Sequence, residues 1–138
     1  QDLSDLPYSL AAADLALVTL SIEAEGLVAP SKLYGHLAAG TPIAAITPPD
    51  SYLRKLVEDE KCGRWFANGN AEDLAAWISE LKQQPAVACC LGQKSRALLQ
   101  RSATPELVTD MYLKLIAQHL PQSARAVSPF VFPSNPGI

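Results

Sequence analysis

Several features that would assign this 138-residue chain to a particular class of protein are missing. Every apolar stretch is interrupted within about ten residues, so neither a membrane-spanning helix nor a secretory signal peptide is expected. No basic stripe accompanies the net charge of −3, which argues against nucleic acid and anionic membrane as partners. With 49% hydrophobic and 18% charged residues, the chain has enough apolar material for a core.

Cysteine is also scarce. The three cysteines, Cys62, Cys89 and Cys90, form neither a disulfide framework nor a metal-ligand spacing, so a reducing cytoplasm is the default location. No metal and no cofactor are expected, since no G-x-G-x-x-G pattern occurs and the P-loop-like spacing of Gly35 and Gly40 lacks the Lys-Ser/Thr that should follow. No G-x-S-x-G elbow points to a hydrolase.

Three short runs rich in apolar or aromatic residues predict strands at Leu15–Leu20, Pro42–Ile46 and Arg64–Ala67. The first two have the continuous apolar character of strands buried on both faces of a parallel sheet. A helix ending at Gly40 and a helix over Tyr52–Asp59, capped by Asp50 or Ser51, separate the runs. The order predicts an α/β fold with a partial Rossmann-like parallel sheet and right-handed crossovers.

The second half of the chain predicts appended helices. The first has an amphipathic face; Pro85 begins the next, with Gly92 as a weak point, and Pro105 begins the last. The residues from 121 to 138 are rich in Pro and Ser, which predicts a tail after a domain over residues 1–120. The expected apolar positions of the first and last helices are Leu74, Trp77, Ile78, Leu81, Leu107, Met111, Leu115 and Ile116.

The stretch from Glu25 to Ile43 organises the chain. An acidic, Gly-containing loop leads through Pro30 to Ser31, which is expected to cap the following helix with its side chain. Lys32 adds a cation to the positively polarised first turn, a combination that suits a phosphate or diphosphate. Because Glu25 could accept hydrogen bonds from sugar hydroxyls, we interpret the stretch as one wall of a nucleotide-sugar site.

These residues resemble a known family. The segments Glu25-Gly26-Leu27-Val28, Pro30–Tyr34 and Leu37–Ile43 are similar to the donor-binding region of group 1 (family 4 type) glycosyltransferases of the GT-B fold. The similarity of order continues to residue 116 and covers most of the chain. It implies the second half of a carboxyl-terminal donor-binding domain, with the acceptor domain outside this chain. The implied activity is transfer of a hexose from a nucleotide-diphospho-sugar to an acceptor, in the cytoplasm or at the inner face of the membrane.

The resemblance also implies roles for particular residues. Glu25 matches the first of the family's two glutamates and is the expected catalytic residue. At the position of the second, ribose-binding glutamate this chain has Gly35, which offers no side chain. The expected donor-binding residues are Gly26, Leu27, Val28, Ser31, Lys32 and Gly35.

Other interpretations stay open at this point. Glu25 could be a solvated loop carboxylate, and His36 fits a partly buried helix residue better than a catalytic base. The chain could also be a non-catalytic α/β module used in assembly. In either case, uncovered sheet edges would invite self-association, and without an acceptor domain no sugar transfer is expected from this chain alone.

Overall fold

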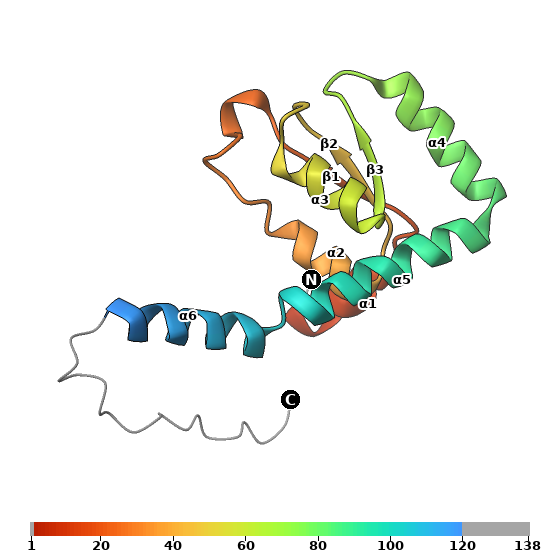
Figure 1. Cartoon of the computed structure of the whole chain (residues 1–138). Helices are drawn as coiled ribbons and strands as arrows, with labels where there is room; N and C mark the ends of the chain where they lie inside the picture. Colours follow the sequence, from red (N-terminus) through yellow and green to blue (C-terminus); the bar gives the residue numbers. More distant parts are fainter. Residues whose placement is uncertain (1, 120–138) are drawn as a thin grey trace. The chain divides into compact units, whose positions relative to one another are not determined.

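The computed structural model describes residues 2–119 and divides the chain into two compact units, one ending at Thr104 and the other beginning at Pro105 (Figure 1). Among the described residues, no helix is long and apolar enough to cross a membrane. The elements of the first unit are η1 (Leu3–Asp5), α1 (Leu6–Ala11), β1 (Ala16–Thr19), η2 (Ile22–Ala24), α2 (Lys32–Ala39), β2 (Ile43–Ile46), α3 (Tyr52–Glu60), β3 (Gly63–Phe66), α4 (Ala71–Gln83) and α5 (Pro85–Ser102).

The three strands form one parallel sheet in the order β1-β2-β3. Ala16 lies opposite Ile43, and Ile43 lies opposite Gly63, so the strands begin at one edge and end together at the other. The prediction of a partial Rossmann-like parallel sheet is therefore confirmed. β1 is two residues shorter than its predicted run, and β2 is one residue shorter. β3 has the predicted length but begins and ends one residue earlier.

One face of the sheet carries the larger apolar core. Helices α2 and α3 and the second half of α5 cover this face, while β2 supplies side chains to both faces. Removing these apolar side chains from water favours folding. The buried members are Ala16, Val18, Leu20, Leu33, Leu37, Ile43, Ala45, Leu53, Val57, Cys62 and Leu98.

A smaller core covers the opposite face, where Ala44 and Phe66 pack against Trp77 and Leu81 of α4. This core does not extend over the first strand. The prediction that β1 is buried on both faces is wrong, because alternate residues are exposed and Leu17 keeps 51% of its surface in contact with solvent. The apolar run predicted the strand correctly, but α4 covers β2 and β3 and leaves this face of β1 open.

The two predicted helix caps have different outcomes. Ser51 caps α3, since its Oγ accepts the Leu53 N–H at 3.2 Å. Ser31 makes no such bond, so the prediction that it caps α2 is wrong. Its backbone already has helical angles, φ −59° and ψ −28°, because the Leu33 N–H closes a turn onto the carbonyl of Pro30. The helix ends as predicted at Gly40, whose φ of +74° favours glycine.

Gly92, predicted as a weak point in α5, has a packing role that the sequence did not reveal. A Cβ atom at Gly92 would lie 2.1 Å from the carbonyl oxygen of Gly40, so the glycine lets α5 approach the end of α2. One turn further on, the buried Ser95 Oγ donates to the Thr41 carbonyl at 2.8 Å and also contacts the Cys62 carbonyl. This region joins α5 to the amino edge of the sheet.

The second unit contains α6 (Pro105–His119), which matches the predicted last helix. None of its described residues is buried, and the predicted apolar positions from Leu107 to Ile116 are exposed. The predicted tail at 121–138 lies outside the described residues.

Candidate functional site

The carboxyl ends of the three strands meet at one edge of the sheet, from which the loops 20–31, 47–51 and 67–70 leave. In open parallel α/β sheets, this is the edge at which ligands bind. Most of the predicted site residues belong to the first of these loops and to the start of α2, which follows it. The sheet therefore brings the expected donor-binding segment to the appropriate edge.

Glu25 lies just after η2 and reaches across to the start of α3. Its Oε1 accepts the Tyr52 N–H at 3.4 Å, across 27 residues of sequence. The carboxylate is thus held at the positive end of the α3 dipole. Its Oε2 is buried and has no hydrogen-bond partner among the described residues. An unsatisfied buried acceptor is costly, so this oxygen favours the arrival of a donor group.

Tyr52 lies beside Glu25, and Tyr34 lies close enough to Tyr52 to affect its pKa. Sequence reasoning did not select either tyrosine for the site. Burial, followed by the charges of Tyr34 and Glu25, raises the pKa of Tyr52. Both tyrosine side chains keep large exposed surfaces. The signals available in the sequence were weak: Tyr34 precedes Gly35 on α2, and Tyr52 follows the Ser51 cap. Neither signal indicates that the two segments meet.

The loop between Glu25 and α2 presents apolar side chains to solvent. Gly26 has a φ of +76° and turns the chain immediately after the carboxylate. Leu27 is 81% exposed and Val28 is more than half exposed. Exposed side chains of this size beside a carboxylate are suited to contact with a ligand or with another part of a protein.

The first turn of α2 is open to an anion. The Leu33 and Tyr34 N–H groups close onto the carbonyls of Pro30 and Ser31, whereas the backbone N–H groups of Ser31 and Lys32 have no acceptor among residues 2–119. Both of those residues are exposed. Free N–H groups at the positive end of a helix, with a lysine beside them, form an electrostatically favourable place for a phosphate.

Gly35 faces α1 and not an open cavity. A Cβ atom there would lie 3.1 Å from Cδ1 of Leu10, so a larger residue would require the leucine to move. One residue further along, the buried Nδ1 of His36 has no partner among the described residues. Burial and then the positive charge of Lys32 lower the pKa of His36, which keeps its imidazole neutral near pH 7. The half-buried position agrees with the interpretation of His36 as a partly buried helix residue.

Side chains that sequence reasoning missed brace the same edge. Nδ2 of Asn68 donates to the Leu20 carbonyl at 3.0 Å and so links the ends of β3 and β1. Nε1 of Trp65 donates to the Thr47 carbonyl at 3.1 Å, and the Arg54 guanidinium lies 4.1 Å from the centre of the Trp65 ring. These contacts hold the strand ends in place.

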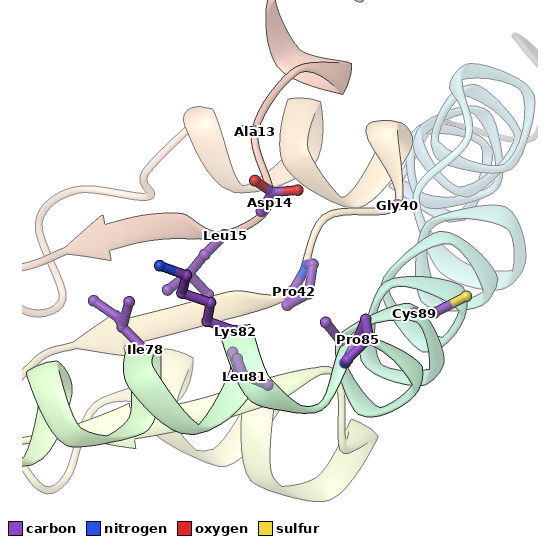
Figure 2. Close-up of a pocket in the computed structure, with 11 residues that line it drawn as sticks. Ala13, Asp14, Leu15, Gly40, Pro42, Ile78, Leu81, Lys82, Pro85 and Cys89 are labelled. Carbon is purple, nitrogen blue, oxygen red and sulfur yellow. The ribbon is translucent and has the colours of Figure 1, made fainter.

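A pocket of about 630 Å³ lies at the opposite, amino edge of the sheet (Figure 2). Asp14 and Leu15 precede β1 and face Ile78 and Lys82 of α4 across it. None of the predicted site residues lines this pocket. The complete lining is Ala13, Asp14, Leu15, Gly40, Pro42, Ile78, Leu81, Lys82, Pro85, Ala88 and Cys89.

The described part of the chain contains no group of three or more His, Cys, Asp or Glu side chains that could hold a metal ion. The carboxyl edge offers the Glu25 carboxylate, the Lys32 ammonium, the open N–H groups of α2 and the hydroxyls of two tyrosines. The exposed carboxylates of Glu23 and Asp50 lie in the same loops. This set suits recognition of a polyhydroxylated, anionic small molecule.

Comparison with known proteins points in the same direction. No family profile matches the chain. A probable glycosyltransferase of Pseudomonas aeruginosa, WbjE, is 27% identical to it over 121 residues. The aligned part covers 88% of this chain and 30% of the relative, so the chain spans less than a third of the length of the protein it matches. The similarity supports a glycosyltransferase-like role in general; the GT-B, family 4 type assignment stays a prediction.

Proposed function

We propose that this chain forms the donor-binding part of a glycosyltransferase, with its site at the carboxyl edge of the sheet. The observation that carries the proposal is Glu25, which is fixed at the start of α3 and has one buried oxygen without a partner among the described residues. The similarity to a probable glycosyltransferase over 88% of the chain supports the class of activity.

The proposed donor is a nucleotide-diphospho-sugar carrying a hexose. Its diphosphate would bind at the first turn of α2, where the Ser31 and Lys32 N–H groups and the Lys32 ammonium supply donors and positive charge. Its sugar hydroxyls would donate to Oε2 of Glu25. Gly26, Leu27 and Val28 would form the wall between the two. Gly35, which faces Leu10 of α1 from within the helix, would not contact the donor directly.

This arrangement fits the charge changes of sugar transfer. When the bond from the sugar to the diphosphate breaks, positive charge grows on the sugar ring and negative charge grows on the leaving diphosphate. Glu25 would stabilise the first charge, and Lys32 with the α2 amino end would stabilise the second. Groups that are already oriented need little rearrangement during reaction, and each is typically worth a few kcal/mol of barrier. The acceptor would be held by a further domain outside this chain.

A second candidate is a non-catalytic α/β module, which two observations favour. The bond from Glu25 to the Tyr52 N–H gives the glutamate a structural reason to be present. The 630 Å³ pocket also lies at the amino edge, away from the predicted site.

Saturation-transfer NMR with UDP, GDP and their hexose derivatives distinguishes the two functions. If the chain has a donor site, saturation should pass from the protein to both the sugar and the nucleotide protons of the bound compound. In Glu25→Gln the saturation signal of the sugar protons should be lost. If none of these compounds gave a saturation-transfer signal, the donor site would be rejected and the non-catalytic module favoured.

A further inference from the structure

The loop 47–51, which connects β2 to α3 at the carboxyl edge, is held at two of its carbonyl groups by side chains from outside the loop. Nε1 of Trp65 donates to the Thr47 carbonyl at 3.1 Å, and Nη1 of Arg54 donates to the Pro49 carbonyl at 3.2 Å. Two consecutive prolines further restrict the backbone of this loop. The position at which α3 begins is therefore well defined.

Arg54, in the first turn of α3, joins this loop to β3. Its guanidinium carbon lies 4.1 Å from the centre of the Trp65 ring, and its Nε donates to Oε2 of Glu58 at 3.1 Å. Together with the bond to Pro49, these contacts fix the guanidinium on three sides, although 34% of the side-chain surface stays exposed. A planar guanidinium can stack on a ring and donate hydrogen bonds at the same time, which suits it to this bridging position.

The position of the loop matters for Glu25. Tyr52, the residue that follows the loop, supplies the N–H that Oε1 of Glu25 accepts. At 3.4 Å this bond is longer than most N–H···O bonds, so a further displacement of a few tenths of an ångström would break it. The carboxylate would then be free to rotate, and Oε2 would leave the place where the sugar hydroxyl is proposed to bind. Every group in this series of contacts lies between Glu25 and Trp65.

We propose that Arg54 is a positioning residue of the donor site. It fixes the loop 47–51, and this loop places the Tyr52 N–H that orients the Glu25 carboxylate toward the sugar. The inference rests on the donor site proposed above. Arg54 acts through the loop and not by contact with the sugar, because its guanidinium is already engaged by protein groups. Loss of Arg54 should weaken recognition of the sugar and leave recognition of the nucleotide unchanged.

The first test needs no ligand. In the isotopically labelled chain, the Tyr52 amide resonance should move between about pH 7 and about pH 3, because its acceptor, the Glu25 carboxylate, takes up a proton. Glu25→Gln identifies the part of this change that comes from Glu25 and not from the neighbouring Asp50. That part should be much smaller in Arg54→Ala. It should be unchanged in the matched control Lys55→Ala, which removes one positive charge from the next, exposed position of α3.

The second test is calorimetric titration with UDP, GDP, UDP-glucose and GDP-mannose. The ratio of the affinities for nucleotide-sugar and free nucleotide measures the contribution of the sugar. It should fall roughly threefold to tenfold in Arg54→Ala, less than in Glu25→Gln, and stay at the wild-type value in Lys55→Ala.

Tyr52→Pro removes the N–H itself. Proline suits the first position of a helix, and Ser51 before it already has the extended angles that a following proline requires, φ −62° and ψ 141°. The variant should therefore fold. Its affinity ratio should lie below that of Tyr52→Ala, which loses the same ring but keeps the N–H.

The outcomes separate this proposal from the donor site itself. If Glu25→Gln loses the sugar contribution while Arg54→Ala keeps either this contribution or the wild-type response of the Tyr52 amide to acid, the positioning role is overturned and the donor site stands. Equal losses of affinity for nucleotide and nucleotide-sugar in Arg54→Ala would mean that Arg54 contacts the phosphates, which also overturns the proposal. If the wild type and Glu25→Gln bind every nucleotide-sugar alike, the donor site fails and the positioning role fails with it.

Discussion

Substitutions at Glu25 separate its structural role from its proposed binding role. Glu25→Ala removes one long hydrogen bond, 3.4 Å, to the Tyr52 N–H at the start of α3. Because this bond is long and exposed, it should contribute no more than an ordinary neutral hydrogen bond, about 0.5–1.5 kcal/mol of unfolding free energy, although its acceptor is charged. For a domain of this size, about 1 kcal/mol corresponds to a fall of roughly 4–8 °C in melting temperature. Glu25→Gln keeps an amide oxygen for the Tyr52 N–H and should melt close to the wild type.

The two variants should behave alike in sugar binding. Each removes the charged acceptor proposed for the sugar hydroxyls, and a hydrogen bond to a charged group contributes about 1.5–3 kcal/mol. The affinity for a nucleotide-sugar should therefore fall roughly tenfold to hundredfold. The affinity for the free nucleotide should be nearly unchanged, because Glu25 is proposed to contact only the sugar.

The assay is calorimetric titration with the nucleotide and its hexose derivative, paired with thermal melts of each variant. Glu80→Ala, which removes an exposed glutamate from α4, controls for the loss of one negative charge. The reasoning is refuted if Glu25→Ala lowers the melting temperature while Glu25→Gln leaves both the melting temperature and the sugar-dependent affinity at wild-type values. Glu25 would then serve the fold alone.

Four further predictions concern other parts of the chain. Lys32→Ala should raise the pKa of His36 but leave it below the ordinary value, because burial is the larger cause of its lowering. An NMR titration of the imidazole protons measures this pKa, and an unchanged value would contradict the described position of Lys32. Because the pKa of His36 is lowered in the folded state, its contribution to stability is present above about pH 6.5 and is lost as the pH falls through the folded pKa. Urea unfolding at several pH values should therefore show a smaller loss of unfolding free energy at low pH in His36→Gln than in the wild type. Gly92→Ala should destabilise the fold by about 1–3 kcal/mol or prevent folding, because its Cβ would overlap the Gly40 carbonyl oxygen. Gln93→Ala, at an exposed neighbouring position, is the control, and equal melting temperatures of the two variants would contradict this packing. The chain alone should transfer no sugar in a radiolabelled-donor assay, since holding donor and acceptor together accounts for about 7–11 kcal/mol of the barrier; acceptor-dependent transfer by this chain would show that the catalytic unit is smaller than proposed.

The strands and helices could be predicted because their signals are local. Continuous apolar runs indicated β2 correctly, and the glycine at position 40 marked the end of α2. The exposure of Leu17 could not be predicted, because the coverage of β1 depends on where α4 packs. The two serine caps illustrate the same limit: Ser31 and Ser51 both precede helices, but only the backbone path decides which side chain reaches a free N–H.

The site could be predicted in part for a related reason. The loop from Glu25 to Lys32 is contiguous in sequence, so its residue types alone suggested carboxylate and phosphate chemistry. The partner of Glu25 lies 27 residues further along, and Ser95 bonds to a carbonyl 54 residues away. Such contacts have no local signature in one sequence. Tyr52 therefore entered the site only when the strands had been placed side by side.

The most direct test of the proposed donor site is to map amide chemical-shift changes while a nucleotide-sugar is added to the isotopically labelled chain. The account predicts shifts in the loop from Glu25 to Val28, in the first turn of α2 at Ser31 and Lys32, and at Tyr52. Shifts confined to residues of the amino-edge pocket, such as Asp14 and Lys82, with no shifts at the carboxyl edge, would contradict it.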